Sequence, residues 1–130
     1  MKFPQFDWQG LTGAAAAGRI VAAAQAQGLL DDLDGVLFHD LDQLSARIAV
    51  LQQCFPARTL HALAIKANPV VRLLRFAVER GMGLEAASLE EVALARAAGC
   101  RPERIVFDSP AKTRREIAQC LAWGVTLNAD

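Results

Sequence analysis

Residues 61–86 read HALAIKANPVVRLLRFAVERGMGLEA, and this stretch decides the fold. It begins with an apolar run, continues from residue 70 with apolar side chains at helical spacing, and then passes through glycine into a second apolar run. Along the helical part, arginine and glutamate lie opposite valine and leucine, so only one face is apolar. The stretch therefore predicts a strand, an amphipathic helix and a second strand.

The same unit repeats toward the end of the chain. Apolar runs begin near His61, Gly83, Arg104 and Val125, at steps of 22, 21 and 21 residues. Strands that alternate with helices in this way are typical of an α/β fold with a parallel sheet.

Start and stop signals mark the helices of this repeat. The starts are side chains suited to N-capping, namely Asn68 before Pro69, Ser88 with Glu91, and Thr113 with Glu116. The last two pairs have the spacing of a capping box. The stops are the glycines Gly81, Gly99 and Gly124.

Two architectures fit this repeat. Helices on one side of the sheet give a βα barrel, whereas helices on both sides give a doubly wound sheet, and the sequence does not decide between them. A closed eight-stranded barrel needs roughly 250 residues. With 130 residues the chain would leave two sheet edges unpaired. We therefore expect the front part of a longer protein or a partner at the edges.

The first part of the chain has a different pattern. Residues 11–30 are rich in alanine, which predicts a helix with Thr12 as its cap and Gly28 as its stop. The apolar run at 36–39 predicts a strand, and the helical spacing from Leu41 predicts a helix after it. We expect an N-terminal helical segment at 1–34 and the first βα units of a barrel at 35–130.

Composition excludes several classes of partner. Fourteen basic and fourteen acidic side chains cancel, so no cationic field attracts a nucleic acid. The first ten residues lack the apolar core of a secretory signal, and Arg19 and Gln25 make the alanine-rich segment too polar for a membrane span. Three cysteines without metal-type spacing indicate neither disulfides nor a zinc site. These features favour a cytoplasmic protein without a metal, membrane or nucleic-acid partner.

Lys66 is the strongest candidate for chemistry. It ends the apolar run 62–65, so we expect it at the carboxyl end of a buried strand, where βα folds build their active sites. A buried lysine there can lose its proton and form an imine with an aldehyde, which arginine cannot do. The alternative is a lysine that extends into solvent or pairs with an acidic neighbour.

Several motifs together carry a family resemblance. AIKANP at 64–69, GLEAAS at 83–88, RIVF at 104–107, SPAKT at 109–113 and Gly124 follow the order and spacing of the group IV pyridoxal-phosphate decarboxylases. Residues 35–47 are similar to the first strand and helix start of that family. The chain thus resembles the N-terminal portion of diaminopimelate and ornithine decarboxylases. Alanine racemases share the fold, but residues 69–72 read PVVR here in place of their Tyr-Gly-His-Gly, which favours a decarboxylase relative.

This resemblance implies a cofactor and a set of site residues. The fold would be part of an alanine-racemase-type TIM barrel, incomplete in this chain, with the aldehyde of pyridoxal 5'-phosphate joined to the catalytic Lys66. Glu85 stands where the family usually has aspartate, and it would either tune the imine and orient the lysine or be a rim charge paired with Lys66. Asn68 and Ser88 lie near the coenzyme in the family, although N-capping already explains both. Lys112 is expected to be solvated.

The resemblance also implies an activity. It is that of a lyase, the decarboxylation of a basic or dibasic amino acid by a homodimer. The phosphate site, the acid opposite the ring nitrogen, the cysteine donated across the dimer and the elements that select the substrate would lie beyond Asp130. This stretch alone is therefore expected to be inactive. The alternatives are a module that holds the coenzyme without turnover, a structural βα module, and an amino-acid racemase relative.

Overall fold

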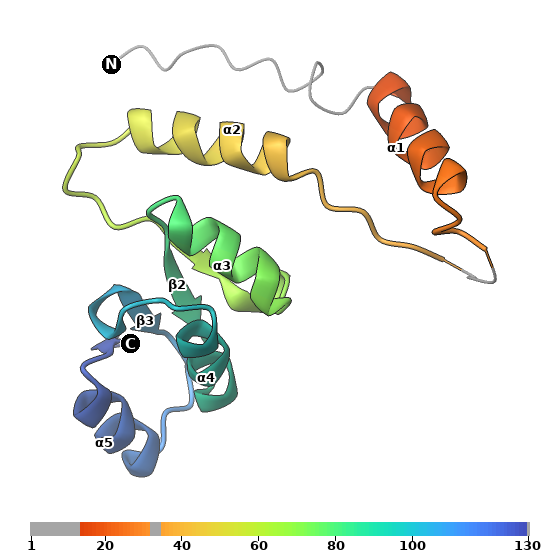
Figure 1. The fold of residues 1–130 in the computed structure, drawn as a ribbon. Coiled ribbons are helices and arrows are strands. Elements are labelled where there is room, and N and C mark those ends of the chain that lie inside the picture. Colours follow the sequence, from red (N-terminus) through yellow and green to blue (C-terminus); the bar gives the residue numbers. More distant parts are fainter. Residues whose placement is uncertain (1–13, 32–34, 130) are drawn as a thin grey trace. The chain divides into compact units, whose positions relative to one another are not determined.

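The computed structural model describes residues 14–31 and 35–129, and its contacts divide the chain into two units, Met1–Ala46 and Arg47–Asp130. Its helices are α1 (Ala14–Ala26), α2 (Leu41–Gln53), α3 (Val71–Glu79), α4 (Leu89–Ala97) and α5 (Arg114–Trp123) (Figure 1). Its strands are β1 (Ala62–Ala64), β2 (Gly83–Ala86), β3 (Ile105–Phe107) and β4 (Thr126–Leu127). Two short 3-10 helices are η1 (Ile65–Ala67) and η2 (Pro102–Arg104). The domain boundary after residue 34 stays a prediction.

Helix α1 in the first unit ends as predicted. Gly28 has a φ of +66°, and the Leu29 N–H donates to the Ala24 carbonyl at 3.0 Å, which is the bonding of a left-handed glycine stop. The expected cap Thr12 lies outside the described residues. None of the helices in the described parts of the chain is long and apolar enough to cross a membrane.

The strand predicted at residues 36–39 is wrong. Residues 35–40 have no regular secondary structure, and Leu37 is 79% exposed. A strand needs a neighbour for its backbone hydrogen bonds, and within the described residues none pairs with this segment. The helix expected from Leu41 does form, and the Asp40 carboxylate caps it by accepting from the Gln43 N–H at 2.9 Å.

The four strands of the second unit form one parallel sheet in the order β1-β2-β3-β4. Leu63 pairs with Leu84, Leu84 with Ile105, and Val106 with Thr126. Each strand therefore lies beside the next one in the sequence, and the repeat of about 21 residues is confirmed as a repeat of βα units.

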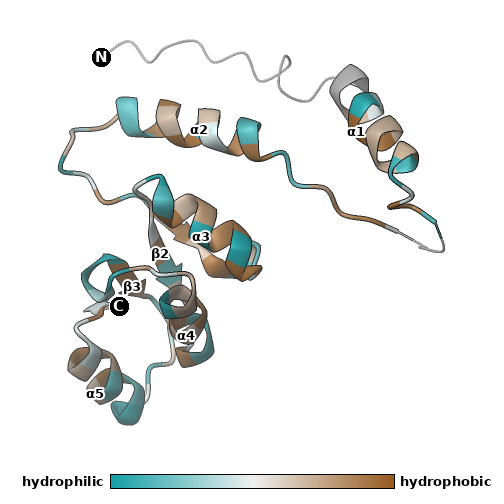
Figure 2. Cartoon of the chain, in the orientation of Figure 1, coloured by the Kyte–Doolittle hydropathy of each residue, from teal (hydrophilic) through white to brown (hydrophobic). Residues whose placement is uncertain are grey.

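Helices α3, α4 and α5 cover one face of this sheet. Alternate strand residues, including Leu84, Ile105 and Phe107, are fully buried in one core with residues of all three helices. The fully buried helix residues in this core are Leu74, Val92, Ala95 and Cys120. Figure 2 shows hydrophobic and hydrophilic residues alternating along α3, as its one-sided pattern predicts. A sequential parallel sheet with its helices on one side is the arrangement of a barrel, which resolves the choice that the sequence left open.

The helix boundaries mostly follow their predicted signals. Gly81, Gly99 and Gly124 all have positive φ angles after their helices. Thr113 and Glu116 form a complete capping box. Ser88 also caps its helix, but the Glu91 carboxylate accepts from the Ala87 N–H, at 2.7 Å, instead of from the N–H of Ser88.

Asn68 is not the N-cap of α3, contrary to expectation. The helix begins at Val71, with Val70 at the cap position. Asn68 closes the turn η1 through its own N–H, and its side-chain oxygen accepts from the Val70 N–H at 3.2 Å. A side-chain bond two residues ahead makes a local turn that competes with helix initiation, so the start of α3 moves along the chain.

Candidate active site

Lys66 lies at the carboxyl edge of the sheet, directly after β1. The strand ends at Ala64, and the fully buried Ile65 anchors the following turn in the core. Lys66 is exposed, so the burial expected for it is wrong in this chain. The reason is the turn η1, which carries the residue past the end of the strand.

Glu85 lies on the neighbouring strand and on the open face of the sheet. The residues on either side of it, Leu84 and Ala86, are fully buried against the helices, so alternation directs Glu85 away from them. It is half-buried, and its register partner on β1 is Ala64, two residues before Lys66. In the described parts of the chain the side chain of neither Lys66 nor Glu85 forms an ion pair or a hydrogen bond. The ion pair considered from the sequence is therefore not formed.

The two polar neighbours, Asn68 and Ser88, hold backbone groups. Asn68 accepts from the Val70 N–H, and Ser88 accepts from the Glu91 N–H at 3.3 Å. Both side chains therefore shape the loops at this edge. Lys112 was expected to be solvated, but it is half-buried and its amine donates to the Ser109 carbonyl.

Two polar residues at the same edge were missed by the sequence analysis. Asp108 follows β3, Asn128 follows β4, and the Asn128 amide donates to the Asp108 carboxylate at 3.1 Å. Their backbones extend the sheet, because the Asp108 N–H donates to Ala86 and the Asn128 N–H to Phe107. The repeat of βα units contained a signal for them, since Asp108 and Asn128 each directly follow a strand of the repeat.

The cysteines give no sign of nucleophilic chemistry. Burial raises the pKa of the Cys100 thiol, and burial likewise raises the pKa of Cys120. Both therefore stay protonated and pack as small apolar groups. The residues that the structure describes contain no cluster of three or more histidine, cysteine or acidic residues that could hold a metal ion.

The sheet with its helices on one face, and a lysine at its carboxyl edge, indicate a protein of the βα-barrel class. Comparisons with known proteins identify the family within this class. The family model described as "Pyridoxal-dependent decarboxylase, pyridoxal binding domain" matches residues 41–130. Diaminopimelate decarboxylase of Deinococcus radiodurans is 38% identical over 93 residues, which cover 71% of this chain and 24% of that protein. Ornithine decarboxylase of Caenorhabditis elegans is 28% identical over 98 residues, or 75% of this chain and 23% of that protein.

Solved structures agree with this assignment. A mutant of Helicobacter pylori diaminopimelate decarboxylase complexed with L-lysine has a TM-score of 0.71 and 27% identity, covering 79% of this chain and 27% of that one. A lysine/ornithine decarboxylase from Vibrio vulnificus supports the fold alone, with a TM-score of 0.70 and 23% identity over 88% of this chain and 30% of that one. The chain spans about a quarter of the length of these relatives.

The chain belongs to the pyridoxal-dependent decarboxylases, in their pyridoxal binding domain. The expected family, the alanine-racemase-type barrel and the cofactor of the family, pyridoxal phosphate, are thereby confirmed. The sheet is an incomplete, N-terminal part of that barrel.

Proposed function

We propose that this chain contributes the coenzyme-binding lysine to an enzyme that decarboxylates a basic or dibasic amino acid. The observation that carries the proposal is Lys66, a primary amine at the carboxyl edge of β1 that the described residues leave without a hydrogen bond or ion pair. In a parallel βα fold this edge is where catalytic groups gather. Membership of a pyridoxal binding family supplies the matching aldehyde.

The residues at this edge fit one end of pyridoxal phosphate. The Lys66 amine is accessible and suits the coenzyme aldehyde, which a guanidinium could not bind. When bound, the coenzyme supplies an electron sink for the carbon that loses carbon dioxide. The chain itself contributes the position of the amine, because the buried Ile65 fixes the turn beside it.

Glu85 is the acid that can act on Lys66. Its carboxylate lies on the adjacent strand, faces away from the helices, and has no partner among the described residues. A negative charge there can orient a nearby amine. We propose that Glu85 orients Lys66. Asn68 and Ser88 support the loops around it.

The substrate class is proposed from relatives. The matching proteins include diaminopimelate and ornithine decarboxylases, whose names indicate amino acids with a second amino group. A homodimer in the cytoplasm is proposed from the family resemblance. The free state of Cys54, Cys100 and Cys120 accords with a reducing compartment.

Peptide mapping tests the role of Lys66 directly. The protein as its gene encodes it is incubated with pyridoxal phosphate, reduced with borohydride and digested with trypsin. A label on Lys66 blocks cleavage there, so the expected product is a pyridoxyl peptide spanning residues 59–72. A label confined to other lysines would overturn the proposal for Lys66.

Carbon dioxide release separates an enzyme from a module that only holds the coenzyme. L-lysine, L-ornithine and meso-diaminopimelate serve as probes. Release from at least one of them is expected together with the Lys66 label. A label without release from any of them would overturn decarboxylation of this substrate class and would favour the module without turnover.

A further inference from the structure

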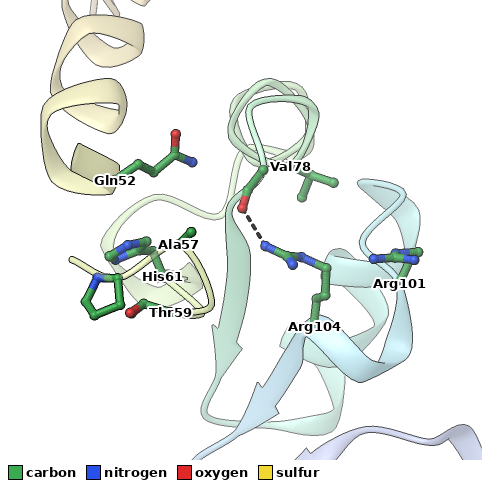
Figure 3. Close-up of a pocket in the computed structure, with 9 residues that line it drawn as sticks. Gln52, Ala57, Thr59, His61, Val78, Arg101 and Arg104 are labelled. Carbon is green, nitrogen blue, oxygen red and sulfur yellow. Dashed lines mark hydrogen bonds between the residues drawn. The ribbon is translucent and has the colours of Figure 1, made fainter. Parts of the chain in front are cut away.

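A cavity of about 590 Å³ lies at the amino edge of the sheet, opposite Lys66. Several residues that line it come just before a strand. Thr59 and His61 precede β1, Gly81 precedes β2, and Arg101 and Arg104 precede β3. Because parallel strands all start at one edge, these residues gather there, and Figure 3 shows Thr59, His61, Arg101 and Arg104 around the cavity. Nothing in the proposed decarboxylation uses this edge.

The charge of the cavity lining is positive. Two guanidinium groups and no carboxylate belong to the described residues that line it. The Arg101 guanidinium lies 3.3 Å from Glu103, but both side chains are largely exposed, at 71% and 61%. An exposed pair of this kind is weak, so Arg101 can exchange this partner for a ligand at little cost.

Arg104 is the more firmly held cation. It is half-buried, and one of its terminal N–H groups donates to the Gly81 carbonyl, the bond that Figure 3 draws. A guanidinium carries five N–H donors, so others remain available. In the part of the chain that the structure describes, no carboxylate pairs with Arg104. A fixed, half-buried and uncompensated guanidinium is suited to an oxyanion.

The rest of the cavity lining offers apolar and hydrogen-bonding surface to the uncharged part of a ligand. Val78, Pro56 and Ala57 supply apolar surface, and the Thr59 hydroxyl and His61 imidazole supply polar groups. The His61 ring packs edge-on against Phe55, with the centroids 5.2 Å apart. A cavity of this size falls within the range of about 300–1,000 Å³ that small-molecule sites usually have.

We propose that this amino-edge cavity binds a small organic anion, with its carboxylate or phosphate group against Arg104 and Arg101. The ligand is a small molecule because a cavity of about 590 Å³ takes one, and the chain has no net charge to hold a polyanion. The site is separate from Lys66, since the two lie at opposite ends of the strands.

Titration followed by backbone amide chemical shifts tests this site. The probes are sodium phosphate and sodium glutarate, added at constant ionic strength to the protein as its gene encodes it, with pyridoxal phosphate bound. Saturable shifts are expected at residues 59–61, 81 and 101–104. Tighter binding of phosphate or of glutarate identifies the preferred anionic group. Shifts that are absent, or that do not saturate with either probe, would overturn the proposal.

Variants sharpen the assignment. Arg104→Met is expected to weaken binding about tenfold, and Arg101→Met less, because only Arg104 is both half-buried and unpaired. The matched control is Arg115→Met, an exposed arginine of α5, which should leave affinity unchanged. Equal losses in all three would indicate diffuse attraction and refute the site. If Arg104→Met fails to fold, the comparison of Arg101→Met with Arg115→Met and the wild-type shift map still test the cavity as a binding site. The Lys66 label tests the proposed function separately, because it reports on the opposite edge of the sheet.

Discussion

The two edges of the sheet hold their candidate functional side chains differently. At the amino edge, side chains close helix ends: Arg104 donates to the Gly81 carbonyl, and Gln52 donates to the Arg80 carbonyl at 2.8 Å. At the carboxyl edge, Lys66 and Glu85 have no such bonds within the described residues. Helices end above the amino edge, where their last carbonyls need donors, whereas α4 and α5 begin at the carboxyl edge, where Ser88 and Thr113 already cap them. The difference leaves the Lys66 amine and the Glu85 carboxylate available for chemistry at the carboxyl edge.

The largest effect is expected for Lys66→Arg. The charge is kept but the guanidinium cannot condense with an aldehyde, so the borohydride-stable pyridoxyl label of the intact protein should disappear. Intact mass and peptide mapping after borohydride reduction measure it. The matched control is Lys112→Arg, at the same edge, which should keep the label. A pyridoxyl label of undiminished mass on the intact Lys66→Arg protein would contradict the assignment.

The amino edge should be the more sensitive to added volume. A Cβ at Gly83 would lie 2.5 Å from the Arg104 carbonyl oxygen and 2.8 Å from Leu60, so Gly83→Ala should lower the free energy of unfolding by about 1–3 kcal/mol. Urea unfolding measures the change. The control is Gly18→Ala in α1, where nothing lies within 4 Å of the new carbon. That variant should gain about 0.5–1 kcal/mol of helix stability, and a loss as large as that of Gly83→Ala would refute the steric explanation.

A smaller effect should distinguish capping from coenzyme binding at the carboxyl edge. Ser88→Ala removes an N-cap and is expected to cost about 1 kcal/mol, with the Lys66 label unchanged. Thr113→Ala removes the cap of α5 and serves as the comparison. If Ser88→Ala reduced the label while Thr113→Ala did not, Ser88 would belong to the coenzyme site.

The smallest expected effect is the dependence of stability on acidic pH. Hydrogen bonds from the Thr113 side chain and backbone hold the pKa of Glu116 below its ordinary value of 4.5. A carboxylate with a lowered pKa in the folded state adds stability above pH 4.5, and this stability is lost as the pH falls through the folded-state pKa. Glu116→Gln should therefore have a slightly lower Tm than wild type at neutral pH, with the gap closing below pH 4.5. A gap that stays constant with pH would contradict this account.

Local rules predicted much of the second unit. The strand repeat, the three glycine stops and the cap at Thr113 depend on residues close together in the chain, so they could be read directly. The candidate Lys66 was found in the same way, from the end of an apolar run. The start of α3 was misplaced because the Asn68 side chain closes a local turn instead of capping the helix. Residues 36–39 had a strand-like pattern, but the described residues provide no neighbouring strand for it.

The sequence by itself determined that parallel βα units form and that a lysine follows the first of their strands. Only the tertiary structure decided that helices α3 to α5 share one face, that Lys66 and Glu85 remain apart from any partner among the described residues, and that Arg104 lines a cavity. The physical reason is range. Hydrophobic spacing and helix caps act over a few residues, whereas strand pairing and bonds such as that of Arg104 to the Gly81 carbonyl join residues some twenty positions apart.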